Sequence, residues 1–426
     1  MNEHGFFVGI DWAAEEHEVC VVDATGSIVG QKSFEHSGEG LASLCTWLHE
    51  FAGGADDALR VGIEVPHGAV VETLLERCIS VFAINPKQLD RFRDRFSVAG
   101  SKNDRLDARV LADSLRTDSH CFRRVEASQS ELIELREWSR LAETLKQEHT
   151  RLSNRIREQL RRYYPQMTEV LGGDVGSDFA LDLWEKLPTP AKTKGIHTVT
   201  VARLLKQHRI RRINAADLLG VLRQRALEVC AGTVDAAQGH IRVMADLLRV
   251  VNRQLAIAHK RIDALFQAMA EQKDDEHSRP SDVEIIASFP GVGRIVLAIL
   301  LSEAPLAVKE RDYRALRALS GVAPVTRQSG KSRVVIMRRA CHPRLRNALH
   351  YWSQIAAQHD PVSGAKYAAL RAKGHKHARA LRTIGDRLLK VVCKMLSEGT
   401  LFDPGHSTRP TSALPQSGAL SIAKTT

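Results

Sequence analysis

The sequence of 426 residues lacks clustered cysteines, long apolar runs and an abundance of aromatic residues, which make up only 5% of it. Its seven cysteines are odd in number and form no C-x-x-C pair, so neither a disulfide framework nor a zinc cluster is expected. No apolar run reaches the roughly 18 residues of a membrane span, and the N-terminus is too short and too polar for a signal peptide. We therefore expect a cytoplasmic protein with no membrane partner.

Acidic residues are also fewer than basic ones. Sixty-one lysines and arginines face 50 aspartates and glutamates, which gives a net charge of +11. Such an excess favours a polyanionic partner such as nucleic acid. The length exceeds the roughly 250–300 residues at which a single hydrophobic core stops growing, so two or three domains are expected.

Residues 1–125 alternate short β-rich runs with helical patterns. Three runs that form a meander come first, and helices then alternate with strands, which predicts a mixed α/β sheet of the ribonuclease H type. The predicted strands are 6–10, 18–23, 27–34, 60–65 and 80–84, and the predicted helices lie near 38–51 and 70–77.

Strand signals disappear over residues 126–275, where apolar residues recur at helical spacing. Between residues 241 and 269 they step by three and four for four heptads, which is the seam of a coiled coil. We expect two long helices, separated by an irregular stretch, to form an antiparallel arm. A homodimer or tetramer would be built through the seam, because the stripe would be exposed in a monomer. The alternative is that both helices pack within one globular core. The seam residues are Ile241, Met244, Leu248, Val251, Leu255, Ala258, Ile262, Leu265 and Met269.

Residues 276–400 predict a basic, mainly helical domain, and the tail 401–426, rich in Ser, Thr, Pro, Gly and Ala, is expected to be disordered. Between Tyr313 and Gly385 there are fifteen lysines and arginines and one acid, Asp360. A merely solvated face would mix both signs, so this asymmetry predicts a phosphate-binding surface. The candidate contacts are Arg327, Lys331, Arg333, Arg338, Arg339, Arg344 and Arg346.

A glycine turn precedes this basic region. Residues 288–294, S-F-P-G-V-G-R, lie between two short apolar helical runs, which is the pattern of a helix-hairpin-helix. In that motif, backbone N–H groups at a helix N-terminus approach a phosphate, which makes Gly291, Gly293 and Arg294 candidate nucleic-acid contacts.

Four carboxylates of the N-terminal region stand out by position. Asp11 follows the first strand run, Glu64 lies inside an apolar strand run, and Asp104 and Asp107 are three apart on one helix face. A lone glutamate in an apolar run is costly to bury unless it is paired or metal-bound. Carboxylates are the hard oxygen ligands that Mg²⁺ prefers, and two such ions can activate a nucleophile and stabilise the leaving oxygen of a phosphodiester. We therefore predict a catalytic Mg²⁺ site at these four acids.

Ser329 lies beside a flexible glycine in the segment L-S-G-V-A-P-V-T-R-Q-S-G-K-S, with three of the candidate cations around it, Arg327, Lys331 and Arg333. A serine attacks phosphate only with a proton acceptor and with cations that absorb the developing charge. The residue types alone favour a solvated loop serine or a hydrogen-bond donor to phosphate. Ser320 and Ser332 are the neighbouring serines.

Together these motifs resemble one known family, the DEDD-type transposases of the bacterial insertion-sequence family numbered one hundred and ten, which are related to site-specific DNA invertases of the Piv type. They follow the family's order and cover most of the chain, from residue 6 to about 396. The matching features are G-I-D at Asp11, I-E-V at Glu64, K-N-D-R-L-D-A at Asp104 and Asp107, P-G-V-G at 290–293 and Q-S-G at Ser329.

The resemblance implies a RuvC-like N-terminal nuclease domain, a coiled-coil arm and a C-terminal transposase domain. It further implies that the four acids bind Mg²⁺ and that Ser329 is the nucleophile, forming a phosphoserine link to donor or target DNA. A structured guide RNA encoded beside the gene would choose the sites, which leaves the protein to hold backbones and suits an aromatic-poor surface. Two features depart from the family's pattern: the middle helical region and the tail are longer, and C-H-P stands at 341–343 where a Gly-Asn pair is common.

Other functions remain open at this point. A RuvC-like structure-selective nuclease would cut with metal-activated water, and a DNA invertase would recombine without an RNA guide. A non-catalytic nucleic-acid-binding protein would not need four intact acids. Only chemistry on Ser329 separates the recombinase from the nuclease, because cutting by water leaves no covalent adduct.

Overall fold

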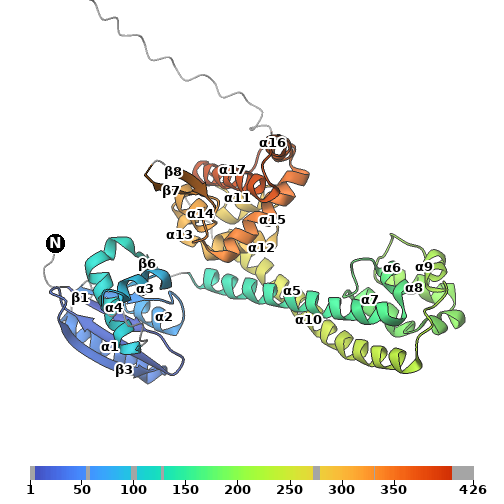
Figure 1. Cartoon of the computed structure of the whole chain (residues 1–426), viewed down its shortest axis with the longest axis horizontal. Helices are drawn as coiled ribbons and strands as arrows, with labels where there is room; N and C mark the ends of the chain where they lie inside the picture. The colour runs from blue at the N-terminus through green and yellow to red at the C-terminus, as the bar shows by residue number, and fades with distance from the viewer. Residues whose placement is uncertain are drawn as a thin grey trace, which may run out of the picture. The chain divides into compact units, whose positions relative to one another are not determined.

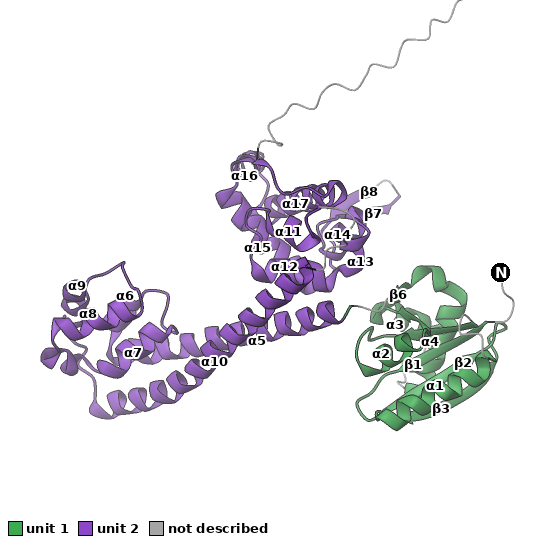
Figure 2. Ribbon diagram, turned by 180° about the vertical axis from the view of Figure 1, so that it is seen from behind, with its two compact units in different colours: residues 1–129 green, residues 130–426 purple. Residues whose placement is uncertain are grey.

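The computed structural model describes residues 5–53, 58–96, 103–125, 129–271, 279–330 and 332–404. Lys331 and residues 405–426 lie outside the described residues, so what is predicted for that lysine and for most of the tail stays a prediction. The chain divides into two compact units, Met1–Gln129 and Ser130–Thr426 (Figure 2). The predicted boundary at residue 275 is therefore not a boundary between compact units. Within the described ranges, no helix has the length and apolarity needed to cross a bilayer.

The described residues of the first unit form a six-stranded mixed sheet (Figure 1): β1 (Phe6–Asp11), β2 (Glu16–Val22), β3 (Ile28–Glu35), β4 (Leu59–Ile63), β5 (Ser80–Ala83) and β6 (Arg123–Val125). The strand order is β3-β2-β1-β4-β5-β6. The β1–β4 and β4–β5 pairs are parallel, and the other pairs are antiparallel. The predicted mixed α/β class is confirmed, whereas β6, a short edge strand, has no counterpart in the prediction.

Helices cover both faces of this sheet: α1 (Gly38–Ala52), α2 (Ala69–Glu76), α3 (Pro86–Arg93), α4 (Asp104–Asp118) and the 3-10 helix η2 (Ser119–Cys121). α1 and α2 pack on one face, where Val8 and Val21 belong to the shared core. α4 lies on the other face, and a Cβ atom on Gly9 would fall 1.9 Å from the carbonyl oxygen of Ala108. Only glycine therefore allows α4 to lie this close to β1.

Two long helices of the second unit, α5 (Ser130–Tyr163) and α10 (Ala231–Glu271), run antiparallel along each other (Figure 1). Near one end Leu135 shares a core with Ile262, and near the other end Leu152 shares a core with Leu248. The predicted seam on α10 therefore packs against α5 of the same chain. The reason given for a dimer through this seam is wrong, because the stripe is already covered.

One end of the two long helices packs into a basic helical domain: α11 (Asp282–Ala287), α12 (Arg294–Glu303), α13 (Pro305–Lys309), α14 (Tyr313–Leu319), α15 (Pro343–His359), α16 (Pro361–Ala372) and α17 (His377–Glu398). Ile262 of α10 shares its core with Trp352 and Leu388. The alternative that the long helices pack within a globular core therefore holds at this end. A hairpin of β7 (Val325–Ser329) and β8 (Ser332–Ile336) belongs to the same domain.

The opposite end carries a small helical bundle of residues 164–230, which we call the head (Figure 1): α6 (Pro165–Leu171), α7 (Asp178–Lys186), η3 (Pro190–Gly195), α8 (Thr198–Gln207) and α9 (Ala215–Leu222). Its core includes Phe179, Trp184 and Leu218 together with Ile241 of α10. The sequence predicted only an irregular stretch here, because helices this short show little periodicity.

The start of the predicted disordered tail is packed. The ring of Phe402 lies 4.5 Å from that of Phe289, and its N–H donates to the hydroxyl of Ser288 at 2.9 Å. The folded chain therefore extends past the predicted boundary at residue 401.

Candidate active site

The ends of two adjacent parallel strands carry the first two acids. Asp11 is the last residue of β1, and Glu64 directly follows β4. Ile10 lies opposite Ile63 in the parallel register, so both acids lie at the same edge of the sheet. The prediction that Glu64 lies inside the strand is wrong, because β4 ends at Ile63; Glu64 is half-buried.

The first turn of α4 brings the other two acids, Asp104 and Asp107, to this edge. Arg105, which lies between them in the sequence, has its side chain 3.7 Å from the carboxylate of Glu18. Glu18 is the direct cross-strand neighbour of Asp11. The four predicted acids therefore gather at one end of the sheet, within one compact unit.

The two acids of α4 differ in environment. Asp104 is exposed, whereas Asp107 is 2% exposed and its Oδ1 accepts a hydrogen bond from Nε of Arg93 at 2.7 Å. This hydrogen bond raises the pKa of Arg93, so the guanidinium stays charged beside the acids. No sequence spacing pointed to Arg93, because only the packing of α3 on α4 brings it there.

Glu18 is a fifth acid that the sequence analysis missed. It lies on the sheet face that α4 covers, since Cys20, two residues on, packs against Ala108. Its Oε1 accepts a hydrogen bond from Ser33, while among the described residues its buried Oε2 has no hydrogen-bond partner. The alternation of side chains along the strand offered a signal, because a glutamate two residues from a buried cysteine lies on the same face of the sheet. Burying a carboxylate there costs free energy unless the carboxylate has a partner.

The carboxylates share an edge without closing into a finished metal site. Across the described residues, the one group of three ligand-type side chains within 4.8 Å of one another is Asp118, His120 and Cys121, at the other end of α4. There Thr117 already donates a hydrogen bond to Asp118 at 2.7 Å. The edge nevertheless suits a hard divalent cation, because it offers several carboxylate oxygens, one of them buried without a hydrogen bond.

The predicted helix-hairpin-helix consists of α11, a turn and α12. Gly291 has a φ of 83° and packs inward, since a Cβ atom there would lie 3.1 Å from Ile355. Arg294 bonds both carboxylate oxygens of Asp263 on α10, at 2.6 and 2.7 Å. Gly293, at the N-terminus of α12, is exposed, so its backbone is the part of the turn that is open to a phosphate.

Ser329 lies at the tip of the β7–β8 hairpin, directly opposite Ser332. Gly330, with a φ of 53°, begins the turn, and both serines are exposed. Ser320 differs, because it is 3% exposed and its hydroxyl donates to the carbonyl of Leu316 at 2.7 Å. This excludes Ser320 as an attacking group and leaves Ser329 and Ser332 accessible.

The hairpin register decides which cations share a face with Ser329. Arg327 lies two residues earlier on β7, so its side chain and that of Ser329 are on the same face. Arg333 pairs with Gln328 and lies on the opposite face. The expectation that both arginines surround Ser329 is therefore met, among the described residues, by Arg327 alone.

A pocket of about 220 Å³ in the same domain is lined by apolar residues such as Leu349 and Leu381 and by the arginines Arg346 and Arg382. Arg382 is half-buried, and no carboxylate of the described residues pairs with it. Burial and the neighbouring charge of Arg379 lower the pKa of Arg382, as expected for clustered cations that lack a counter-ion. The pocket is therefore suited to an anionic group such as a phosphate.

The remaining predicted cations are of two kinds. Arg339 is exposed, and Arg338 donates a hydrogen bond to the carbonyl of Ala323 at 3.4 Å. Arg344 is held inside the protein, where it bonds Glu143 of α5 at 2.8 Å and also Glu303 of α12. Contrary to the prediction, Arg344 serves the fold rather than a nucleic-acid surface.

Glu303 is the centre of this ion cluster. Its side chain is 4% exposed and accepts hydrogen bonds from Arg344 and from Arg140 of α5. Burial alone would raise the pKa of Glu303, but the hydrogen bond from Arg140 and the charges of Arg344 and His342 lower it overall. The cluster therefore fastens α5 to the basic domain through an ionised, buried carboxylate.

The free energy of unfolding of a Glu303→Gln variant is expected to be about 3 kcal/mol lower than that of the wild type at neutral pH, because two guanidinium groups lose their buried carboxylate. The carboxylate's contribution to the free energy of unfolding is present above its unfolded-state pKa of 4.5 and is lost as the pH falls through the lower pKa of the folded state. The difference from wild type, measured by urea unfolding, should therefore shrink in acid. Glu137→Gln is the matched control, since Glu137 also contacts Arg140 but is 61% exposed, and it should cost less than about 0.5 kcal/mol. Equal losses in the two variants would contradict this account.

Two family models match the chain in separate stretches. A model of DEDD transposases of the IS110 type matches residues 8–165, and a model of the IS116/IS110/IS902 transposase family matches residues 283–368. The first stretch contains the four acids and the second contains Ser329. The mini-circle putative transposase for IS117 of Streptomyces coelicolor is 31% identical over 415 residues, which cover 95% of this chain and 97% of that protein.

The chain belongs to the IS116/IS110/IS902 family of transposases. The family predicted from the motifs is thereby confirmed. The putative transposase y4uE of Sinorhizobium fredii is 53% identical to this transposase over 210 residues, 49% of this chain but only 58% of that protein's own length. The uncharacterized 43.6 kDa protein of insertion element IS110 from S. coelicolor is 27% identical over 307 residues, 71% of this chain and 72% of that protein. Since the IS117 alignment covers nearly all of both chains, the long middle region is not peculiar to this transposase.

Proposed function

We propose that this transposase cuts and rejoins DNA through a covalent phosphoserine intermediate at Ser329. The observation that carries the proposal is the position of this serine, an exposed hydroxyl at the tip of a hairpin in a basic domain. A hydroxyl placed in this way can reach a phosphodiester that a recessed group cannot. Arg327, on the same face, can stabilise the charge that builds on the phosphate oxygens.

The proposed reaction conserves phosphate esters. Oγ of Ser329 attacks phosphorus and forms a new O–P bond, while the bond from phosphorus to a deoxyribose oxygen breaks. The hydroxyl gives up its proton and the leaving oxygen takes one up. The hydroxyl of a second DNA end then attacks the phosphoserine, which restores Ser329. No ATP is needed, because no ester bond is lost to water.

The acids of the first unit are proposed to hold Mg²⁺, which would lower the cost of deprotonating a hydroxyl or expelling an oxygen. Asp11 and Glu64 would approach the ion from strand ends, and Asp104 and Asp107 from a helix turn. Arg93 supports this arrangement, because its hydrogen bond fixes the carboxylate of Asp107 and balances part of the negative charge. Such outer contacts orient metal ligands in many proteins.

A structured guide RNA is proposed as a partner beside donor and target DNA. Exposed cations such as Arg339 and Arg346 and the open backbone at Gly293 suit sugar–phosphate contacts, which position nucleic acids without reading their sequence. The choice of site would then rest on base pairing by the RNA.

Labelled DNA that carries the ends of the mobile element tests the proposal. The protein is incubated with this DNA, with and without RNA transcribed from the neighbouring non-coding stretch, and the products are run on a denaturing gel. A protease-sensitive protein–DNA adduct is expected only when the RNA is present. An adduct that forms without RNA favours an invertase, and cut DNA without an adduct favours a water-cutting nuclease.

A homodimer is proposed to form through a second stripe of α10, in place of the covered seam. Val243, Leu247, Val250 and Ile257 are exposed large apolar residues at heptad-related spacing, so they line one face of the helix. Proteins seldom leave such a stripe in water. A second copy of the same helix offers the matching surface, and two such dimers would make a tetramer.

Replacing Leu247 and Val250 together by glutamate is expected to turn the dimer into a monomer, because like charges would face each other across the contact. Sedimentation without nucleic acid measures the oligomeric state of the wild type and of the variant. The control replaces the exposed Arg242 and Arg253 by glutamine, which changes the net charge equally, and should stay dimeric. Wild-type protein that sediments as a monomer, with and without nucleic acid, would reject the interface.

A further inference from the structure

The head carries a second concentration of positive charge. Between residues 187 and 226 there are nine lysines and arginines and one acid, Asp217. Asp217 is itself engaged, since Asn214 donates a hydrogen bond to it at 2.6 Å. Eight of the nine cations are exposed and form no ion pair within the described residues, since only Arg225 pairs with a carboxylate; four of the eight, Arg203, Lys206, Arg209 and Arg211, lie on α8 and in the turn that follows it.

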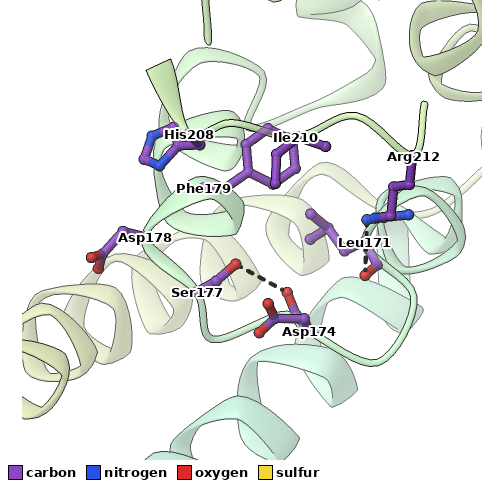
Figure 3. Close-up of a pocket in the computed structure, with 8 residues that line it drawn as sticks. All are labelled: Leu171, Asp174, Ser177, Asp178, Phe179, His208, Ile210 and Arg212. Atoms are coloured by element: carbon purple, nitrogen blue, oxygen red, sulfur yellow. Dashed lines mark hydrogen bonds between the residues drawn. The ribbon is translucent and has the colours of Figure 1, made fainter. Parts of the chain in front are cut away.

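The turn that follows α8 is anchored on one side and open on the other. Figure 3 shows His208, Ile210 and Arg212 around a pocket of about 240 Å³. His208 is hydrogen-bonded to a carboxylate of α7, and Arg212 donates to two backbone carbonyls of α6. The alternate residues Arg209 and Arg211 are exposed. The hydrogen bonds of His208 and Arg212 thus hold the turn in place, while Arg209 and Arg211 face solvent.

Arg209 occupies a position that favours glycine. Its φ is 55°, in the left-handed region, and its N–H donates to the carbonyl of Lys206 at 3.1 Å as the helix ends. A side chain at this position costs stability, and helices commonly end here with glycine. Strained residues of this kind are concentrated at functional sites.

α8 continues the exposed surface. Val199, Arg203 and Lys206 are spaced by four and three, so they form one stripe along the helix, while Val201 and Leu204 face the core. A helix that exposes this mixture of an apolar and two cationic side chains fits the major groove of B-form DNA, which is about 12 Å wide. The major groove of A-form RNA is too narrow for it.

We propose that this basic face of the head, formed by the α8 stripe with Arg209 and Arg211, binds duplex DNA. α8 would lie in the major groove, and the two arginines of the turn would contact phosphates beside it. This contact is separate from the hairpin of Ser329, because the head and the basic domain lie at opposite ends of α5 and α10 and have separate cores.

The test compares two double variants of the full chain that lose the same net charge. Arg209→Gln with Arg211→Gln removes the two turn arginines. Arg151→Gln with Arg225→Gln removes exposed arginines that already pair with Glu148 and Glu228. Binding to a labelled random-sequence DNA duplex is measured across salt concentrations. The slope of log affinity against log salt should fall by about two in the first variant, at about 0.9 per lost phosphate contact, and stay unchanged in the second.

Equal slopes in the two variants would overturn the inference. A loss of affinity for an RNA duplex of the same length, with unchanged affinity for the DNA duplex, would also overturn it. Arg209→Gly provides an independent reading: its Tm should rise, because glycine relieves the left-handed strain, while DNA binding weakens. A rise in Tm with unchanged binding would also overturn it. Adduct formation at Ser329 should stay unchanged in the control variant, Arg151→Gln with Arg225→Gln. If the wild type forms no adduct, the phosphoserine chemistry fails while the DNA contact of the head is still tested by the slopes.

Discussion

A Ser329→Ala variant is expected to lose both strand transfer and the protease-sensitive protein–DNA adduct. Alanine offers no oxygen to bond phosphorus, and removing a nucleophilic serine typically lowers catalysis by a factor on the order of 10⁶. Affinity for DNA and RNA should change less than about twofold, because the cations of the basic domain are untouched. A denaturing gel with labelled DNA and the RNA measures the adduct, and a filter-binding assay measures the affinity.

Ser332→Ala is the sharpest control for this prediction. Ser332 is exposed and lies directly opposite Ser329, so Ser332→Ala makes the same chemical change in the same hairpin. It should leave the adduct in place. An adduct that survives Ser329→Ala but vanishes with Ser332→Ala would move the nucleophile across the hairpin. Active protein that forms no adduct in any variant would favour cutting by water.

Periodicity in the sequence predicted which face of a helix is buried, but not what covers it. The seam on α10 was predicted correctly as an apolar stripe, and Ile241, Leu248 and Ile262 are fully buried. The covering surface is α5 of the same chain rather than a second copy. Spacing within one helix carries no information on its partner, because α5 and a second α10 would satisfy the same stripe.

Charge counts have a related limit. Fifteen cations in one region indicated a phosphate-binding surface, yet Arg344, one of the fifteen, is bound by two glutamates, and Arg294, a candidate contact that precedes this region, is bound by an aspartate. Their partners lie on α5, α10 and α12, far away in the sequence. A count of local charge therefore cannot distinguish a cation that is available to bind phosphate from one that forms an ion pair between two helices.

Most of the acidic site was predictable from local context, since Asp11 ends a strand and Asp104 and Asp107 share a helix turn. Glu18 was missed because its relation to Asp11 depends on the register of β1 and β2. Arg93 was missed because it acts from another helix. What depends on one element was predicted, and what depends on packing between elements was not.

Glu64→Gln is expected to reduce DNA cleavage and adduct formation by more than about 100-fold. Changes to residues that only contact a metal ligand cost up to about 100-fold, and the loss of a ligand itself should cost more. The substitution keeps the size of the side chain and removes its charge. It should leave the fold intact, because Glu64 is half-buried and lies beyond the end of β4. Glu72→Gln, an exposed acid in the first turn of α2, is the matched control and should cut at the wild-type rate.

Magnesium also gives this prediction a readout besides activity. An ion that binds only the folded protein raises its Tm with increasing concentration, because binding adds to the free energy of unfolding. Wild type and Glu72→Gln should show this rise, and Glu64→Gln should show a smaller one at every Mg²⁺ concentration. A folded Glu64→Gln protein that cuts DNA at the wild-type rate would remove Glu64 from the metal site. A variant that loses cleavage but keeps the full rise in Tm would mean that Glu64 acts on the DNA rather than on the ion.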